Sequence, residues 1–156
     1  MVRGLIDRER ELDELRRLAA GGDRRLAILY GRRQVGKTFL LSHVWQGGRV
    51  FYFLAADSTA ELNRRDLLNE LTTWSGRSLE PADYPTWRTI FRLFVDLATD
   101  EPLVVVLDEF QYLLVGADDV ASQLVAVWDR EAGGRPLTLV LSGSEVGTME
   151  GLLVGG

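Results

Sequence analysis

The chain has 156 residues, of which 46% are hydrophobic, and it carries a formal net charge of −5. These values fit one globular domain and argue against a bulk electrostatic grip on nucleic acid, which we would expect only of a longer parent protein. The absence of cysteine excludes disulfides and thiolate metal sites. Without a signal-like apolar segment or a run of the ~18 apolar residues that cross a membrane, we expect a cytoplasmic protein.

The first third of the chain alternates helical patterns with apolar runs. Leucines at three-residue steps among charged residues predict an amphipathic helix over 8–20, which Gly21 and Gly22 end. An apolar strand is expected at 26–30, a helix at 36–46 and a second strand at 50–54. The strands are apolar almost throughout, which is typical of parallel strands that are covered on both faces.

The rest of the chain continues the alternation. A capping box over 58–61 predicts a helix that ends at Gly76, with an apolar face made of Leu62, Leu67, Leu68, Leu71 and Trp74. The following elements are a helix over 87–97, a strand at 103–107, a helix between Asp118-Asp119 and Gly133-Gly134, and a strand at 137–141. This order of elements predicts an α/β fold.

A phosphate-binding loop is the strongest motif. The pattern GxxxxGK[ST] directly follows the 26–30 strand and comprises Gly31, Arg32, Arg33, Gln34, Val35, Gly36, Lys37 and Thr38, with Phe39 next in the predicted helix. The two glycines let backbone N–H groups converge on a phosphate at the N-terminus of that helix. The lysine, the only one in the chain, would reach the β- and γ-phosphates, and the threonine hydroxyl would bind Mg²⁺.

An acidic pair, Asp108 and Glu109, follows the 103–107 strand. Carboxylates at the carboxyl end of a parallel strand lie where open α/β sheets bind ligands. We expect Asp108 to hold Mg²⁺ through its water shell and Glu109 to deprotonate the attacking water. An ordinary solvated acidic turn is the alternative, which the preceding phosphate loop disfavours. Ser142 or Ser144, after the last predicted strand, would sense the γ-phosphate or position water.

Four separated stretches resemble one known family. Tyr-Gly-Arg-Arg-x-Val-Gly-Lys-Thr at 30–38, Tyr-Phe-Leu-Ala at 52–55, Leu-Asp-Glu-Phe-Gln-Tyr-Leu at 107–113 and Ser-Gly-Ser-Glu-Val-Gly-Thr-Met-Glu at 142–150 are similar to the prokaryotic "archaeal ATPase" family of AAA+/STAND-type P-loop ATPases. The opening residues 5–12 resemble the family's N-terminal box, which implies that Ile6, Asp7 and Arg8 surround the adenine.

The resemblance implies a P-loop NTPase three-layer sandwich with a parallel sheet of order 2-3-4-1, in which the serine-bearing strand separates the phosphate strand from the acidic strand. Residues 1–156 would form a single core domain, with the adenine-box helix at 5–20 and the core at 26–156. Family members continue into a fifth core strand, a lid and C-terminal domains. We therefore expect a core fragment that hydrolyses ATP slowly and self-associates, or binds a protein partner, through the uncovered edge of the 26–30 strand.

Two functions follow from these expectations. The first is ATP binding with Mg²⁺-dependent hydrolysis that drives a conformational switch. The alternative is an ATP-binding interaction or signalling module with negligible hydrolysis. A GTPase is disfavoured because Gln111, rather than glycine, stands three places after Asp108, and because no lysine remains for a guanine-reading motif. A small-molecule phosphotransferase would need an acceptor pocket and a lid that the sequence does not reveal.

Overall fold

The structure is a computed structural model that describes residues 23–30, 48–115, 119–144, 148 and 151. Three sequence predictions therefore lie outside the described residues: the helix over 8–20, the phosphate-binding loop and the helix over 36–46. The remaining predicted strands and helices all fall within the described residues, and each of them is present.

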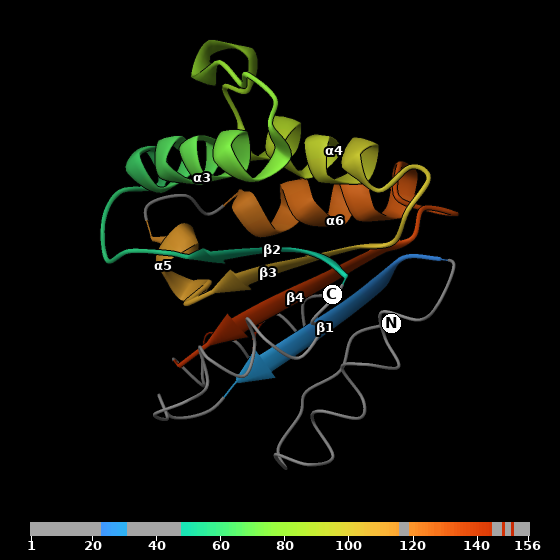
Figure 1. The fold of residues 1–156 in the computed structure, drawn as a ribbon. Coiled ribbons are helices and arrows are strands. Elements are labelled where there is room, and N and C mark those ends of the chain that lie inside the picture. Colours follow the sequence, from blue (N-terminus) through green and yellow to red (C-terminus); the bar gives the residue numbers. More distant parts are fainter. Residues whose placement is uncertain (1–22, 31–47, 116–118, 145–147, 149–150, 152–156) are drawn as a thin grey trace.

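Four parallel strands form one sheet (Figure 1). They are β1 (Arg25–Tyr30), β2 (Arg49–Leu54), β3 (Leu103–Asp108) and β4 (Leu137–Gly143). Their order across the sheet is β1-β4-β3-β2, which is the predicted order read from the opposite edge. The prediction that the serine-bearing strand separates the phosphate strand from the acidic strand is thus confirmed. β1 and β2 are the edge strands of the described sheet, and the predicted self-association through β1 stays a prediction.

The strand register brings the carboxyl ends of all four strands to one edge of the sheet. Leu29 of β1 lies opposite Ser142 of β4, and Tyr30 lies opposite Gly143. In the other half of the strand order, Leu54 of β2 lies opposite Asp108 of β3. Every residue of β3 and β4 is buried, as the apolar composition of these strands predicts for the centre of a parallel sheet.

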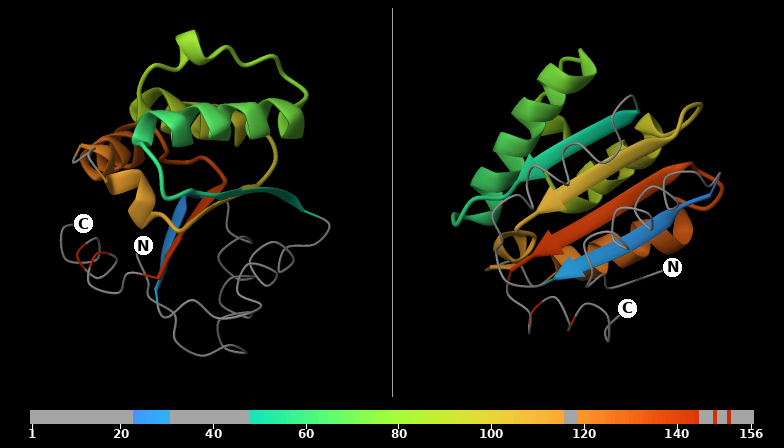
Figure 2. Two further views of the ribbon diagram at one scale, coloured as in Figure 1. Left: turned by 90° about the vertical axis from the view of Figure 1, so that its left-hand side faces the viewer. Right: turned by 60° about the horizontal axis from the view of Figure 1, so that its bottom comes forward.

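Three long helices cover one face of this sheet (Figures 1 and 2). They are α3 (Ala60–Ser75), α4 (Trp87–Leu97) and α6 (Val120–Arg130). A short 3₁₀ helix, η1 (Pro81–Asp83), lies in the connection between α3 and α4. A short helix that the sequence did not predict, α5 (Gln111–Leu114), follows β3. None of the helices in the described ranges is both long and apolar enough to cross a membrane.

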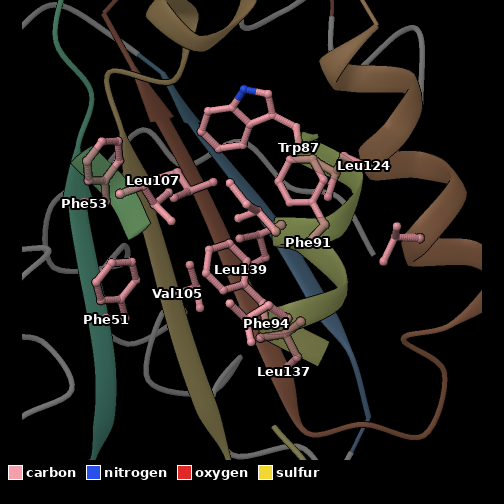
Figure 3. Packing of buried hydrophobic residues seen from close by; sticks show 14 of the residues in the cluster. Phe51, Phe53, Trp87, Phe91, Phe94, Val105, Leu107, Leu124, Leu137 and Leu139 are labelled. Carbon is pink, nitrogen blue, oxygen red and sulfur yellow. The ribbon is translucent and has the colours of Figure 1, made fainter. Parts of the chain in front are cut away.

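Between these helices and the sheet lies a continuous set of buried side chains, which we call the apolar layer (Figure 3). Phe51 of β2 packs against Trp74 of α3 and Phe94 of α4, with ring centroids 5.7 Å and 6.2 Å away. Phe91 lies next in the row, 6.4 Å from Phe94. Aromatic pairs at this spacing add to the free energy gained from burying their surface. The apolar layer fixes the helices on the sheet and so positions the sheet edge at which the carboxyl ends of the strands lie.

Helix α3 departs from its predicted start and face. Its N-cap is Thr59 rather than Ser58, because the Thr59 hydroxyl accepts a hydrogen bond from the Leu62 N–H at 3.1 Å. Leu62 is 49% exposed, because the inward position beside it is taken by Asn63. The Asn63 amide is buried and pairs with the backbone of Ala56 through two hydrogen bonds, of 2.9 Å and 3.0 Å. These hydrogen bonds link the β2–α3 connection to the helix. The pattern of apolar residues in the sequence does not predict such a link.

Candidate functional site

Asp108, the last residue of β3, has a buried carboxylate that is 2% exposed. Its Oδ1 accepts a hydrogen bond from the backbone N–H of Glu109 at 2.8 Å. Its Oδ2 accepts a hydrogen bond from the hydroxyl of Tyr52, which stands on the neighbouring strand β2. Among the described residues, each carboxylate oxygen therefore has one donor, and the two donors fix the plane of the carboxylate relative to the sheet.

Glu109 makes the turn from β3 into α5, and it is the only non-glycine residue with a positive φ (52°) in the described part of the chain. This left-handed conformation costs a side-chain-bearing residue roughly 1–2 kcal/mol. The turn is held on both sides, since Phe110 donates its N–H to the Ser142 carbonyl at 2.8 Å and Tyr112 donates to the Glu109 carbonyl at 3.0 Å. The Glu109 side chain is only 4% exposed.

The carboxylate of Glu109 contacts two donors through one oxygen. The Gln111 amide nitrogen donates to Glu109 Oε2, and the Ser144 hydroxyl donates to the same oxygen at 2.9 Å. Gln111 Nε2 also donates to Ser144 Oγ at 3.2 Å, so the three side chains close a hydrogen-bonded ring. We call these residues, together with Tyr52 and Asp108, the polar cluster.

The two candidate serines have different environments. Ser144 belongs to the polar cluster, whereas Ser142 lies within β4, which runs two residues further than predicted. Ser142 is fully buried, and among the described residues its Oγ has no hydrogen-bond partner. Buried hydroxyls are nearly always hydrogen-bonded to protein or water, so this one calls for an additional donor or acceptor. Its neighbour across the ladder is Leu29, near the end of β1.

The polar cluster lies at the edge of the sheet from which the predicted phosphate-binding loop departs. Tyr30, the last residue of β1, is paired with Gly143, and Gly31 follows directly. The loop residues 31–38, Phe39 and the predicted adenine-box residues Ile6, Asp7 and Arg8 lie outside the described residues. The topology therefore places only the residue that precedes the loop, and one strand, β4, lies between it and the strand that carries the acidic pair.

The carboxylates of the polar cluster suit a cation that keeps most of its water and phosphate ligands. Within the described ranges, no three His, Asp or Glu side chains converge to hold a metal ion. Mg²⁺ is commonly bound through one or two carboxylates and completes its octahedron with water and substrate phosphates. Asp108, a single oriented carboxylate at a sheet edge, fits that mode of binding.

Sequence reasoning missed the roles of Tyr52 and Gln111. Tyr52 is separated from Asp108 by 56 residues, and Gln111 from Ser144 by 33, so neither contact has a local signature. A partial signal existed for Tyr52, because a phenol in an otherwise apolar strand needs a hydrogen-bond partner when it is buried. For Gln111 the signal was a polar residue just after a strand end that already carried two carboxylates.

Comparisons with known proteins identify a family and a fold to which the chain is similar. A family model described as an ATPase domain predominantly from Archaea matches residues 5–155. An uncharacterised protein of Methanocaldococcus jannaschii is 23% identical over 146 residues, which cover 92% of this chain and 30% of that protein.

Two solved structures share the fold. A Walker-type ATPase of Pyrococcus abyssi superposes with a TM-score of 0.66 at 22% identity, covering 96% of this chain and 48% of that one. Cdc6p of Pyrobaculum aerophilum superposes with a TM-score of 0.60 at 20% identity, covering 96% of this chain and 44% of that one. The chain thus spans less than half the length of each of these relatives.

Proposed function

The chain belongs to the family of ATPase domains found predominantly in Archaea, and from this premise we propose that it binds ATP and hydrolyses it with Mg²⁺, driving a conformational switch. The observation that carries the proposal is the position of Asp108 and Glu109. They are buried at the carboxyl end of β3, and only β4 separates that strand from β1, which leads into the phosphate-loop motif. P-loop enzymes need these two parts at one sheet edge.

In this proposal the loop residues 31–38 bind the phosphates. Their backbone N–H groups and the N-terminus of the following helix favour an anion, and Lys37 adds a positive charge near the β- and γ-phosphates. Phe39, which follows the loop, contributes to the nucleotide pocket. So do Ile6, Asp7 and Arg8, which the family resemblance implies lie around the adenine. Ser142, whose buried hydroxyl lacks a partner among the described residues, is the candidate for contact with the γ-phosphate or with water.

Asp108 and Thr38 are the residues that would hold Mg²⁺. When bound, the ion neutralises charge on the phosphate oxygens. Asp108 contributes a carboxylate whose orientation Tyr52 and the Glu109 N–H already fix. Holding this group before the nucleotide arrives avoids the entropy of ordering it during binding.

Glu109 acts as the general base in this proposal. A base must be held within hydrogen-bond reach of the water whose proton it takes. The strained turn at Glu109 supports this assignment, because backbone strain persists where the surrounding structure enforces it and it is concentrated at active sites. A carboxylate with a merely structural role would be expected in ordinary backbone geometry.

ATP turnover and ATP binding, measured side by side, test the proposal. Glu109→Gln should retain ATP affinity and lose about 10²–10⁴-fold in turnover, because it removes the base and keeps its shape. Lys37→Ala should abolish Mg-ATP binding by isothermal titration without unfolding the protein. The matched control is Glu101→Gln, the same chemical change. Glu101 is exposed and lies just before the start of β3, at the end of the strand away from Asp108, so this variant should leave turnover unchanged.

Three outcomes separate the possibilities. Unchanged affinity in Lys37→Ala would refute the phosphate-loop assignment. ATP binding by a wild-type chain that does not turn ATP over would favour a signalling module with negligible hydrolysis. Undiminished turnover in Glu109→Gln would show that another group is the base. We further propose that the chain binds a protein partner or self-associates through the uncovered edge of β1, and that it acts in the cytoplasm.

A further inference from the structure

Gln111 is the first residue of α5, and its side chain is 2% exposed. Its amide nitrogen faces two oxygens, Glu109 Oε2 and Ser144 Oγ. The amide cannot be turned the other way, because its carbonyl oxygen would then face a carboxylate oxygen, acceptor against acceptor. Glu109 therefore sets the orientation of the Gln111 amide, whose Oε1 has no hydrogen-bond partner among the described residues.

The ring uses every available proton. The two Nε2 protons of Gln111 go to Glu109 and Ser144, and the single hydroxyl proton of Ser144 goes to Glu109. Both bonds to the carboxylate end on the same oxygen, Oε2, so rotating the carboxylate would break both together. Hydrogen bonds linked in this way also polarise one another, which strengthens each of them.

The hydrogen-bonded ring forms around a residue whose backbone conformation is itself unfavourable. Glu109 has a positive φ, and this conformation persists only where neighbouring groups enforce it. Gln111 lies two residues later on a helix whose first turn is anchored to the Glu109 carbonyl through Tyr112. Ser144 holds the carboxylate from the far side, just beyond the end of β4.

We infer that Gln111 is a positioning residue for ATP hydrolysis: its amide holds the Glu109 carboxylate through Oε2, with Ser144 as the second holder. The inference rests on the proposed function, in which Glu109 is the base. Gln111 contacts neither nucleotide nor water in this role and acts only through Glu109. Misplacing a catalytic group by about 1 Å can cost on the order of 10²-fold in rate, so loss of the ring should lower turnover without weakening ATP binding.

A double-mutant cycle tests this inference. Gln111→Met keeps the length of the side chain and removes both donors. We expect it to lower kcat about 10–100-fold while the Kd for ATP, measured by isothermal titration, changes less than about twofold. In a Glu109→Gln background the same substitution should have no further effect on residual turnover, measured with radiolabelled ATP, because the group that Gln111 positions is already lost.

A matched control is available on another helix. Gln123 of α6 also uses its amide within the protein, accepting a hydrogen bond from the Arg88 N–H at 2.9 Å. Gln123→Met is the same chemical change away from the polar cluster and should leave kcat unchanged. If Gln111→Met prevents folding, Ser144→Ala replaces it in the cycle, because it removes one of the two bonds to Oε2 and leaves α5 intact. Ser144→Thr, which keeps the hydroxyl, should restore turnover.

The outcomes distinguish this inference from the proposed function. Full kcat in Gln111→Met, an equal loss in both backgrounds or a weakened Kd for ATP would overturn the positioning role while Glu109 remained the base. Unchanged turnover in Glu109→Gln alone would show that another group is the base and would overturn the inference, whatever Gln111→Met does. A wild-type chain that binds ATP without turning it over would instead refute the hydrolysis that the proposed function requires. A loss of kcat that is confined to the chain with Glu109 intact is the result that supports the inference.

Discussion

The apolar layer and the polar cluster are both buried, and they obtain their order in opposite ways. In the apolar layer, Phe51, Phe91 and Phe94 pack without any directional bond, and removing their surface from water stabilises the fold. In the polar cluster, the carboxylates of Asp108 and Glu109 lose water on burial, and specific donors must compensate. Burial of the apolar layer thus stabilises the fold, whereas burial of the polar cluster costs part of that free energy.

This difference supports our proposal that the active site lies at the edge of the sheet that carries the polar cluster. Four buried polar side chains, those of Asp108, Glu109, Gln111 and Ser142, lie at one sheet edge. Among them are a left-handed glutamate and a hydroxyl without a partner among the described residues. Natural sequences depart from local rules mainly at functional sites, where the cost is offset elsewhere. The apolar layer supplies that offset here, so the two regions should respond differently to substitution.

The largest expected effect is in the apolar layer. Phe94 is 1% exposed and lies between Phe51 and Phe91. Phe94→Ala should lower the free energy of unfolding by about 3–5 kcal/mol, since it removes buried surface and leaves a cavity that the rigid strands cannot close. Urea unfolding measures this. Phe94→Leu, which keeps most of the volume, should cost clearly less, and an equal cost for both would mean that ring-specific contacts dominate.

A smaller effect is expected in the polar cluster. Tyr52→Phe keeps the ring and removes the donor to Asp108, which leaves a buried carboxylate oxygen with one bond fewer. A hydrogen bond to a charged group contributes about 1.5–3 kcal/mol, and the free energy of unfolding should fall by that amount. If Asp108 holds Mg²⁺ as proposed, half-maximal turnover should also require more Mg²⁺.

The control for this change is Tyr112→Phe in α5. The Tyr112 hydroxyl makes no hydrogen bond to any residue in the described part of the chain, so its removal should alter stability by less than about 0.5 kcal/mol. Equal costs for the two tyrosines would show that the bond from Tyr52 to Asp108 contributes nothing beyond packing, and the comparison between the two regions would lose its main support.

The apolar layer could be predicted from sequence because its signal is local. The three- and four-residue spacing from Trp87 to Leu97 predicts α4 with the bounds that the structure has. The apolar run that ends at Asp108 predicts β3, and the family resemblance supplied the strand order. The periodic pattern fails only where a polar residue faces inward, as Asn63 does beside the exposed Leu62.

The polar cluster could be predicted only in part. Asp108 and Glu109 were identified from their place after an apolar strand, whereas the donors that hold them come from other elements. Tyr52 stands on β2 and Ser144 follows β4, so their contacts exist only once the register of the sheet is set. Helix α5 also escaped prediction, because four residues after a strained turn carry no periodic signal.

The smallest expected effect concerns a carboxylate that lacks the donors of the polar cluster. Glu70 lies on α3, and its pKa is raised above the ordinary value of 4.5 by partial desolvation first and by Asp66, one turn earlier, second. The folded state therefore binds this proton more tightly than the unfolded state does. Below pH 4.5 Glu70 is protonated in both states, and as the pH rises through its folded pKa the protein loses stability.

Glu70→Gln removes this penalty. At pH 7 the free energy of unfolding should rise by about 0.2–0.5 kcal/mol, the usual size of a like-charge pair one helical turn apart, and the gain should vanish below pH 4.5. In that background Asp66→Asn should add nothing at pH 7, because the repulsion is already gone. Urea unfolding at both pH values decides: a stabilisation that persists below pH 4.5 would assign it to helix propensity instead of charge. Glu70 would then no longer contrast with Asp108 as a carboxylate that is desolvated without a hydrogen-bond donor in the described part of the chain.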